Sequence, residues 1–363
     1  MNAVVATRTP VAWRPAPARI ALLGTGTVGK AVLARLAGWE GTPLGGRLSL
    51  RYAANSRFGC QPTTCADALA RVAQCDSTAP ADTLRDVLGT LGDRGLRIVI
   101  DATASEAVTE SHAHWLAQGI HVVTACKLGQ GTSLARWRAI HDAQCTGRSR
   151  YGDSATVGAG LPLLRSIRAL QAGGDRIHAI AGVLSGSLAW LFNHYDGLRP
   201  FSSFVRQARD AGYTEPDPRD DLSGEDVRRK LLILARAAGF LMEDHEADVS
   251  PVIPPSLASL PAGAFDVALP EFDVRLCERH AEACKRNERL RFIARLEHGK
   301  ARAGLESLQA DHPLATGVGT DNRVAIWSDR YCRQPLVIQG PGAGAEITAA
   351  ALLDDVLKIA SCG

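Results

Sequence analysis

The stretch Arg19-Ile20-Ala21-Leu22-Leu23-Gly24-Thr25-Gly26-Thr27-Val28-Gly29 decides the fold of the first part of the chain. It begins as a short apolar run, continues as G-x-G-x-x-G, and leads into a helical pattern, the context that a dinucleotide-binding fingerprint requires. Gly24 allows the tight turn, Gly26 lets the backbone approach a pyrophosphate, and Gly29 lets the helix close on the strand. We therefore expect an α/β Rossmann-type domain. The alternative is a glycine turn with a structural role only.

The end of the second expected strand bears on the choice of cofactor. This strand covers residues 48–54 and runs into Asn55-Ser56-Arg57. NAD sites usually carry Asp or Glu here, to bind the ribose 2′-hydroxyl. Because Arg57 and its small polar neighbours suit a 2′-phosphate better, we expect NADP, with NAD as the alternative. The competing interpretation makes Arg57 a solvated loop residue.

Polar residues follow two further expected strands, at residues 96–100 and 120–123. The first runs into Thr103 and Ser105, and the second runs into Lys127. Ligands of open α/β sheets bind at the carboxyl ends of the strands. We therefore expect these three residues near the ligand, although Lys127 could equally be a surface charge.

The stretch from Gly212 to Lys230, GYTEPDPRDDLSGEDVRRK, places acidic residues in a Pro- and Gly-rich loop that enters a helix. At about 100° per residue, Lys230 falls inside the apolar arc of that helix. Asp226 precedes it by four residues, so the two side chains can meet. Carboxylates beside a half-buried lysine can hold an amino acid and move its proton.

Two structural interpretations compete with that functional one. Lys230 could extend to the surface and pair with Asp226 there. Ser223 and Asp226 could instead form a capping box at the start of the helix.

Composition restricts the class of protein. A chain of 363 residues can hold two domains, and 46% apolar with 22% charged residues is typical of a soluble globular protein. The net charge of +3 argues against nucleic acid, and no apolar stretch reaches the ~18 residues of a membrane span. Residues 1–18 lack a secretory signal and read as a flexible extension.

The cysteines point to a reducing compartment. There are nine, none in a C-x-x-C pair, which predicts free thiols in the cytoplasm and no zinc site. Cys126, beside Lys127, is a candidate reactive thiol.

The second part of the chain is expected to form another domain. Residues 154–162 are a glycine-rich loop that opens a helix, and a strand from Ile177 to Leu184 ends in serines that can cap the next helix. Residues 290–298, 323–327 and 335–339 read as β-rich, and a glycine turn at 340–344 precedes a final helix over 346–360. This helix is expected to return to the first domain. We thus expect 19–150 with 338–363 to bind the dinucleotide and 151–337 to form a second, α+β domain.

Four segments together, residues 156–163, 180–188, 212–230 and 335–349, resemble homoserine dehydrogenase. The similarity is to the dehydrogenase half of bifunctional aspartokinase–homoserine dehydrogenases and extends from about Ile20 to the end. Because no kinase segment precedes it, the resemblance implies a stand-alone enzyme, without threonine feedback of the usual kind.

The resemblance implies a Rossmann domain, a mixed-sheet domain that binds substrate, a homodimer, and NAD(P)-dependent interconversion of L-homoserine and L-aspartate 4-semialdehyde. Lys230 would be the acid/base and Lys127 would assist it. Glu215, Asp221 and Asp226 would hold the substrate. Together with the motif residues, the expected cofactor contacts are Gly24, Thr25, Gly26, Thr27, Val28, Gly29, Asn55, Arg57, Thr103, Ser105, Lys127, Gly212, Glu215 and Gly344.

The resemblance also implies a monovalent cation, Na⁺ or K⁺, held by the backbone carbonyls of Val157, Ala159 and Leu161. Ser154 stands where many members of the family have Glu, which weakens this expectation. Cys126 stands where the common motif has Asn, which could change local hydrogen bonding or expose a thiol to oxidation.

Two other functions compete with this one. The chain could be a dehydrogenase for another small amino acid or semialdehyde. It could also be a nucleotide-sensing protein that has lost catalysis, although retention of Lys127, Lys230 and their acidic partners argues against that.

Overall fold

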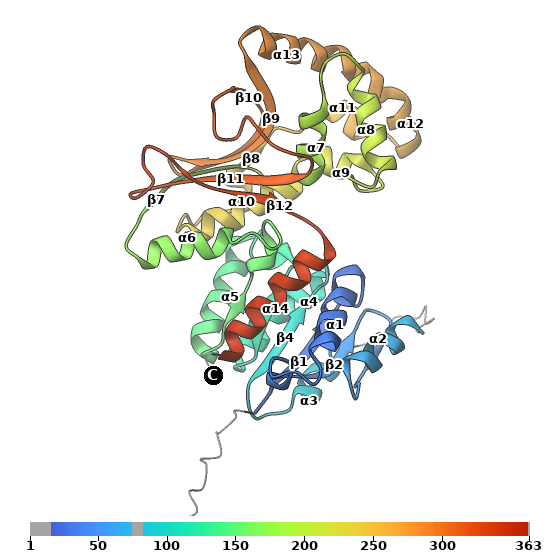
Figure 1. Cartoon of the computed structure of the whole chain (residues 1–363), viewed down its shortest axis with the longest axis vertical. Coiled ribbons are helices and arrows are strands. Elements are labelled where there is room, and N and C mark those ends of the chain that lie inside the picture. Colours follow the sequence, from blue (N-terminus) through green and yellow to red (C-terminus); the bar gives the residue numbers. More distant parts are fainter. Residues whose placement is uncertain (1–15, 75–82, 362–363) are drawn as a thin grey trace, which may run out of the picture.

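The computed structural model describes residues 16–74 and 83–361, which form two units around two sheets (Figure 1). The expected extension at residues 1–18 lies largely outside the described residues, and Ala18 already begins the first strand. The first sheet has the order β3-β2-β1-β4-β5-β6. Its strands are β1 (Ala18–Leu23), β2 (Leu48–Ala54), β3 (Gly59–Cys60), β4 (Arg97–Asp101), β5 (His121–Thr124) and β6 (Tyr151–Gly152).

All pairings in the first sheet are parallel except that of β3 with β2. Helices cover both of its faces, which is why its strands are nearly continuous apolar runs. Ile20 and Leu22 face one helix layer, whereas Ala21 and Leu23 face the other. The helices of this unit are α1 (Thr27–Trp39), α2 (Cys65–Ala73), α3 (Asp86–Leu91), α4 (Glu106–Ala117), α5 (Leu134–Gly147) and α14 (Ala345–Ser361). The expected Rossmann-type fold is confirmed.

The second sheet is mixed and has the order β12-β11-β7-β9-β10-β8. Its pairings are antiparallel except that of β10 with β8. Its strands are β7 (Ile177–Val183), β8 (Ala247–Val249), β9 (Glu288–Glu297), β10 (Lys300–Gln309), β11 (Asp321–Ser328) and β12 (Leu336–Pro341). An α+β unit with a mixed sheet was expected here and is confirmed.

The helices of the second unit pack on one face of its sheet. Ile180, Phe292 and Ile326 belong to this large core, whereas the opposite face carries a smaller cluster around Ile293 and Ala325. The helices are α6 (Leu163–Ala172), α7 (Gly186–His194), α8 (Phe201–Asp210), α9 (Pro218–Leu222), α10 (Glu225–Ala237), α11 (Pro255–Ala258), α12 (Ala262–Ala268) and α13 (Asp273–Lys285).

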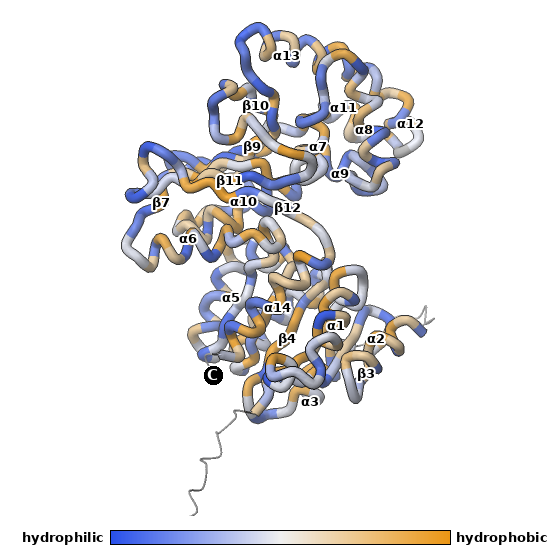
Figure 2. Tube along the Cα trace, in the orientation of Figure 1, coloured by the Kyte–Doolittle hydropathy of each residue, from blue (hydrophilic) through white to orange (hydrophobic). Residues whose placement is uncertain are grey.

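The chain crosses between the units twice. β6, which ends at Gly152, completes the first sheet, and β12, which ends at Pro341, completes the second. After β12 the chain returns as α14, which lies beside α1 in Figure 1 and, like β4, is rich in hydrophobic residues in Figure 2. No helix within residues 16–74 and 83–361 is both long and apolar enough to cross a membrane.

Candidate active site

A cavity of about 830 Å³ lies between the two units, where the strand ends of the first sheet face α10. Residues expected at the site converge on it from distant parts of the chain. Val28 comes from α1, Lys127 follows β5, and Lys230 lies on α10. Of the remaining expected residues, those lining the cavity are Thr103, Ala159, Gly212, Glu215, Asp221, Asp226 and Gly344.

Another cavity, of about 700 Å³, lies between β8, β10 and α13. Its charged lining residues are Asp248, Arg275, Arg279, Arg302 and Glu306, and it contains no lysine. It is remote from the carboxyl ends of the Rossmann strands, so we place the site in the cavity between the units.

Asp226 lies between two lysines. Its Oδ2 is 2.7 Å from Lys230 Nζ and its Oδ1 is 3.2 Å from Lys127 Nζ. Lys230 Nζ also donates to the carbonyl of Leu184 at 2.8 Å, and only 11% of its side chain is exposed. The pairing of Asp226 with Lys230 is therefore confirmed, but the interpretation that places the ammonium group at the surface is wrong.

The capping-box interpretation of Asp226 is also wrong. The N-cap of α10 is Gly224, in the left-handed region at φ 76°, and it has no side-chain cap. Ser223 Oγ accepts from Glu225 N at 3.2 Å instead. The Asp226 carboxylate pairs instead with the ammonium groups of Lys230 and Lys127.

The two lysines decide the protonation state of Asp226. Loss of hydration in the cavity raises the pKa of the Asp226 carboxyl, but the charges and hydrogen bonds of Lys230 and Lys127 outweigh this effect, and the pKa lies well below its usual range. Asp226 is therefore ionised at neutral pH.

Asp221 has the opposite electrostatic surroundings. Burial raises the pKa of its carboxyl, and nearby Asp226 and Asp220 add to the shift, against hydrogen bonds that lower it. Those bonds come from Ser187 Oγ at 2.5 Å and from Glu215 N at 2.8 Å. Asp221 thus lines the cavity and also holds the backbone of Glu215 in place.

Ser187 is a site residue that the sequence did not reveal. Ser185 caps α7 as expected, accepting from Leu188 N at 3.2 Å, and its hydroxyl lies 2.9 Å from that of Ser187. Ser187 itself points to Asp221. Its place at a helix start directly after a strand end was the available signal, but a cap and a site residue look alike at that position.

The glycine turn after β1 has the shape that a pyrophosphate needs. A Cβ on Gly29 would lie 1.8 Å from the carbonyl oxygen of Gly24, and one on Gly24 would lie 2.6 Å from that of Ala102. A Cβ on Gly26 would meet none of the described residues within 4 Å, and no described side chain caps the start of α1. Open space before uncapped N–H groups fits a phosphate.

Some of the remaining cofactor candidates line the cavity, and others do not. Thr103 Oγ1 donates to Asp101 Oδ1 at 2.7 Å and lines the cavity. Ser105 caps α4 by accepting from Val108 N at 3.4 Å and does not line the cavity. Asn55 bonds Thr25 Oγ1 through Nδ2 and Arg57 N through Oδ1, so it shapes the turn that leaves Arg57 exposed.

The loop expected to bind a cation is tightly folded. Gly158 and Ala159 have φ of 72° and 48°, and the Leu161 carbonyl already accepts from Leu163 N at 2.8 Å. The N–H and the hydroxyl of Ser154 each donate a hydrogen bond of 2.9 Å to the carboxylate of Asp355. The carboxylate that contacts residue 154 therefore comes from α14. Within the described part of the chain, His, Cys, Asp and Glu side chains form no metal-binding group of three or more. The cation stays a prediction.

Cys126 does not have the surroundings of a reactive thiol. It is 4% exposed, its Sγ lies 3.4 Å from Thr109 Oγ1, and it does not line the cavity. Burial, with a contribution from Asp101, raises the pKa of the Cys126 thiol, which disfavours the nucleophilic thiolate.

Comparison with known proteins identifies related sequences over both units. The family model described as "Homoserine dehydrogenase, NAD binding domain" matches residues 24–151, and the one described as "Homoserine dehydrogenase" matches residues 162–357. A homoserine dehydrogenase of Emericella nidulans is 37% identical over 278 residues, covering 73% of this chain and 76% of that protein.

Two further proteins show how much of each relative is matched. A chloroplastic bifunctional aspartokinase/homoserine dehydrogenase 2 of Zea mays is 40% identical over 73% of this chain, which spans 29% of the maize protein. The crystal structure of a Candida auris protein of unknown function has a TM-score of 0.85 at 33% identity, covering 95% of this chain and 98% of that one.

Proposed function

Because the chain belongs to the homoserine dehydrogenase family, whose members are NAD(P)-dependent oxidoreductases acting on a CH–OH group, we propose that it interconverts L-aspartate 4-semialdehyde and L-homoserine. In the direction of reduction this step serves the biosynthesis of threonine, methionine and isoleucine. The observation that carries the proposal is the arrangement of Lys127, Asp226 and Lys230, which meets the glycine turn of the Rossmann unit at one cavity.

Lys230 is the proposed acid/base. The nicotinamide cofactor, when bound, supplies or accepts the hydride, and the protein handles the proton. During reduction Lys230 Nζ donates a proton to the aldehyde oxygen, and during oxidation it takes the proton of the hydroxyl. Asp226 and the Leu184 carbonyl hold this nitrogen in place, which fixes its aim.

Glu215 and Asp221 are the proposed partners of the substrate ammonium group, and Lys127 assists at the substrate oxygen. Asp226 was also expected to hold the substrate. Its charge is already balanced by two lysines, so its larger contribution in this proposal is to orient them. Ser187 supports the same group of residues through its bond to Asp221.

NADP is the proposed cofactor, bound with its pyrophosphate over Gly26 and its ribose 2′-phosphate near Arg57. The open space at Gly26 and the exposure of Arg57 at the end of β2 support this arrangement. Steady-state kinetics with NADPH and NADH test it: kcat/KM should be higher for NADPH, and an equal or higher value for NADH would contradict the preference.

Several finer points belong to the same proposal. A homodimer, which the resemblance to the family implies, is part of the proposal and is testable by sedimentation. Six of the described cysteines form no disulfide, which supports a cytoplasmic location; they are Cys65, Cys126, Cys145, Cys277, Cys284 and Cys332. A monovalent cation at the 157–161 loop would make activity depend on Na⁺ or K⁺.

A direct assay tests the function. The purified protein is mixed with aspartate semialdehyde and NADPH, and the absorbance of NADPH is followed. The proposal expects a fall that depends on semialdehyde. Tight binding of NADPH without turnover would support the nucleotide-sensing alternative instead.

A further inference from the structure

Arg236 is an unusual charge in the interior of the protein. It lies on α10 beyond Lys230 and is 3% exposed. Its guanidinium donates to three backbone carbonyls, those of Gln130, Thr132 and Met242, with four hydrogen bonds between 2.5 and 3.3 Å. Within residues 16–74 and 83–361 it forms no ion pair with a carboxylate.

A buried cation whose hydrogen bonds within the described residues all go to carbonyl groups is costly to maintain, even though the charges of Glu243 and Asp244 act favourably on it. Burial lowers the pKa of Arg236, which is the sign of that cost, and removing a charge from water is offset only when its partners are well placed. An apolar side chain would avoid that cost but would leave these carbonyls without the donor that Arg236 supplies. The positions of the carbonyl groups that Arg236 binds therefore indicate its role in the structure.

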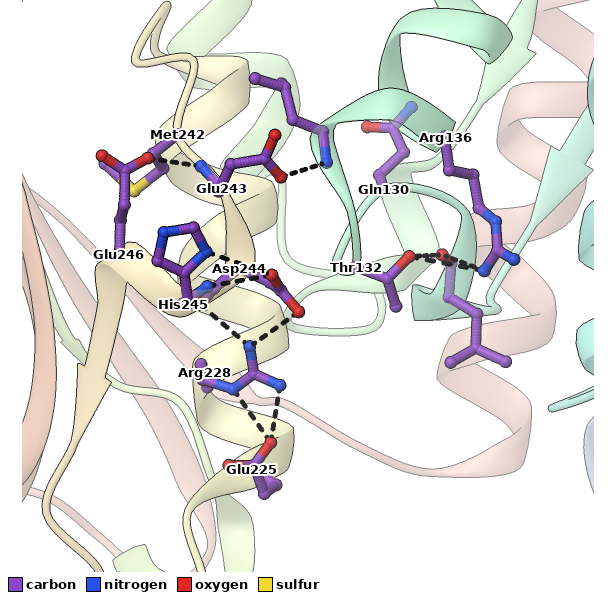
Figure 3. A network of polar contacts seen from close by, with 12 residues as sticks. Gln130, Thr132, Arg136, Glu225, Arg228, Met242, Glu243, Asp244, His245 and Glu246 are labelled. Atoms are coloured by element: carbon purple, nitrogen blue, oxygen red, sulfur yellow. Dashed lines mark hydrogen bonds and ion pairs between the residues drawn. The ribbon is translucent and has the colours of Figure 1, made fainter.

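Those carbonyls belong to both units. Gln130 and Thr132 lie in the loop between Lys127 and α5 of the first unit, whereas Met242 follows α10 in the second. Figure 3 shows this loop facing the segment from Met242 to Glu246, and Glu243 accepts from Leu134 N at 3.0 Å beside it. Arg236 thus joins the loop that starts at Lys127 to the helix that carries Asp226 and Lys230.

The same loop touches α10 at a second point. A Cβ on Gly131 would come within 2.9 Å of both the Arg229 carbonyl oxygen and the Lys127 carbonyl oxygen. Gly131 N also donates to the Lys127 carbonyl at 2.7 Å. The loop therefore rests directly on the backbone of α10, one residue before Lys230.

We propose that Arg236 is a positioning residue, which sets the distance between Lys127 and the Asp226–Lys230 pair by joining their two backbone segments. This inference rests on the proposed function, in which the three side chains act together. Lysine cannot replace arginine here, because a single ammonium group does not reproduce a planar fork that reaches three carbonyls.

The central test uses Arg236→Lys, with Arg228→Lys as the matched control. Arg228 is on the same helix and donates to the Asp244 carbonyl, but it does not contact the Lys127 loop. For Arg236→Lys we expect kcat to fall about 10-fold or more, as for a misplaced catalytic group, while NADPH binding stays within about twofold. Arg228→Lys should keep kcat within about twofold of the wild type.

A double mutant separates positioning from general stability. If Arg236 acts through Lys127, then Arg236→Lys should cause no further loss of kcat in a Lys127→Ala background. Multiplying losses would overturn the proposal, as would a lower Tm with an unchanged kcat for Arg236→Lys. Should that variant not fold, Gly131→Ala replaces it, because the added methyl displaces the loop while Arg236 remains.

Hydrogen exchange gives a readout that does not need activity. Amides of residues 128–134 should exchange faster in Arg236→Lys but not in Arg228→Lys, and unchanged exchange would also overturn the proposal. If the wild type shows no turnover, the proposed function fails, and this measurement alone decides whether Arg236 holds the loop.

Discussion

Asp226 of the second unit forms ion pairs with Lys230 of its own helix and with Lys127 of the first unit. Its contact with Lys230 follows from their spacing on one helix, whereas its contact with Lys127 depends on the placement of β5 opposite α10. A carboxylate held by two ammonium groups keeps both close to the cavity although they repel each other. Single-residue changes here should therefore alter the chemistry more than the fold.

Lys230→Ala should lower kcat by about 10²-fold or more, the usual scale for loss of an acid/base group. The matched control is Lys285→Ala, on the exposed α13, which should leave kcat unchanged. Stopped-flow or steady-state measurement of NADPH consumption checks this. A near-normal kcat for Lys230→Ala would remove it from the mechanism.

Protonation of Asp221 should cause the fall in kcat/KM on the acid side of the pH profile, which we call the acid limb. Its pKa is raised, so its carboxylate is present above that pKa and is lost as the pH falls through it, at a higher pH than for an ordinary aspartate. We therefore expect kcat/KM for homoserine to decrease on acidification through this range, mainly by a rise in KM.

Asp221→Asn should lower kcat/KM about 10-fold or more at neutral pH and remove that limb, because a buried hydrogen-bonded charge is lost. Asp354→Asn on α14, an exposed carboxylate, is the control. An unchanged acid limb in Asp221→Asn would assign it to another group.

At the scale of elements, two glycines of the β1–α1 turn have different roles, one in folding and the other in cofactor binding. Gly29 is required by the protein itself, since a Cβ there would overlap the Gly24 carbonyl. Gly26 has room for a methyl group in the protein alone, so its lack of a side chain is explained by the ligand.

Two alanine variants of this turn should therefore differ. Gly26→Ala should keep the Tm of the protein without cofactor while the Kd for NADPH rises about 10-fold or more. Gly29→Ala should lower the Tm sharply, by the equivalent of about 3 kcal/mol or more for overpacking. Thermal melts with and without NADPH, together with a binding titration, test both, and normal NADPH binding by Gly26→Ala would refute the expected phosphate position.

At the scale of the whole molecule, the end of the chain completes the unit with which it began. α14 packs against α1 and contributes Leu352, Leu353 and Val356 to the core over the first sheet. This return also brings Gly344 to the cavity and Asp355 to Ser154. The stability of the Rossmann unit and the shape of the site therefore depend on the same helix.

Leu353→Ala should lower the free energy of unfolding by about 3 kcal/mol, as expected for truncating a fully buried leucine. Lys358→Ala, on the exposed side of the same helix, should change it little. Denaturant unfolding monitored by circular dichroism measures both, and similar values for the two variants would show that α14 is not part of the cooperative core.

Local patterns in the sequence determined the Rossmann strand, turn and helix, the Asp226–Lys230 pair and the return of the final helix, whereas the mixed sheet of the second unit was implied by the resemblance. Each depends on residues near one another in the chain or on strand-end geometry that all open α/β sheets share. The same reasoning left a capping box open as an alternative for Asp226 and assigned Ser187 to a cap, because a polar residue at a helix start has identical local spacing in either role.

Only the tertiary structure decided which groups far apart in the sequence form ion pairs or hydrogen bonds with each other. It brought Lys127 to Asp226, Ser187 to Asp221, and Arg236 to Gln130 and Thr132. These contacts arise from how the two units pack, and no periodicity within one segment encodes the distance to another. The protonation states of Asp221 and Asp226 follow from that packing, since burial and neighbouring charges set them.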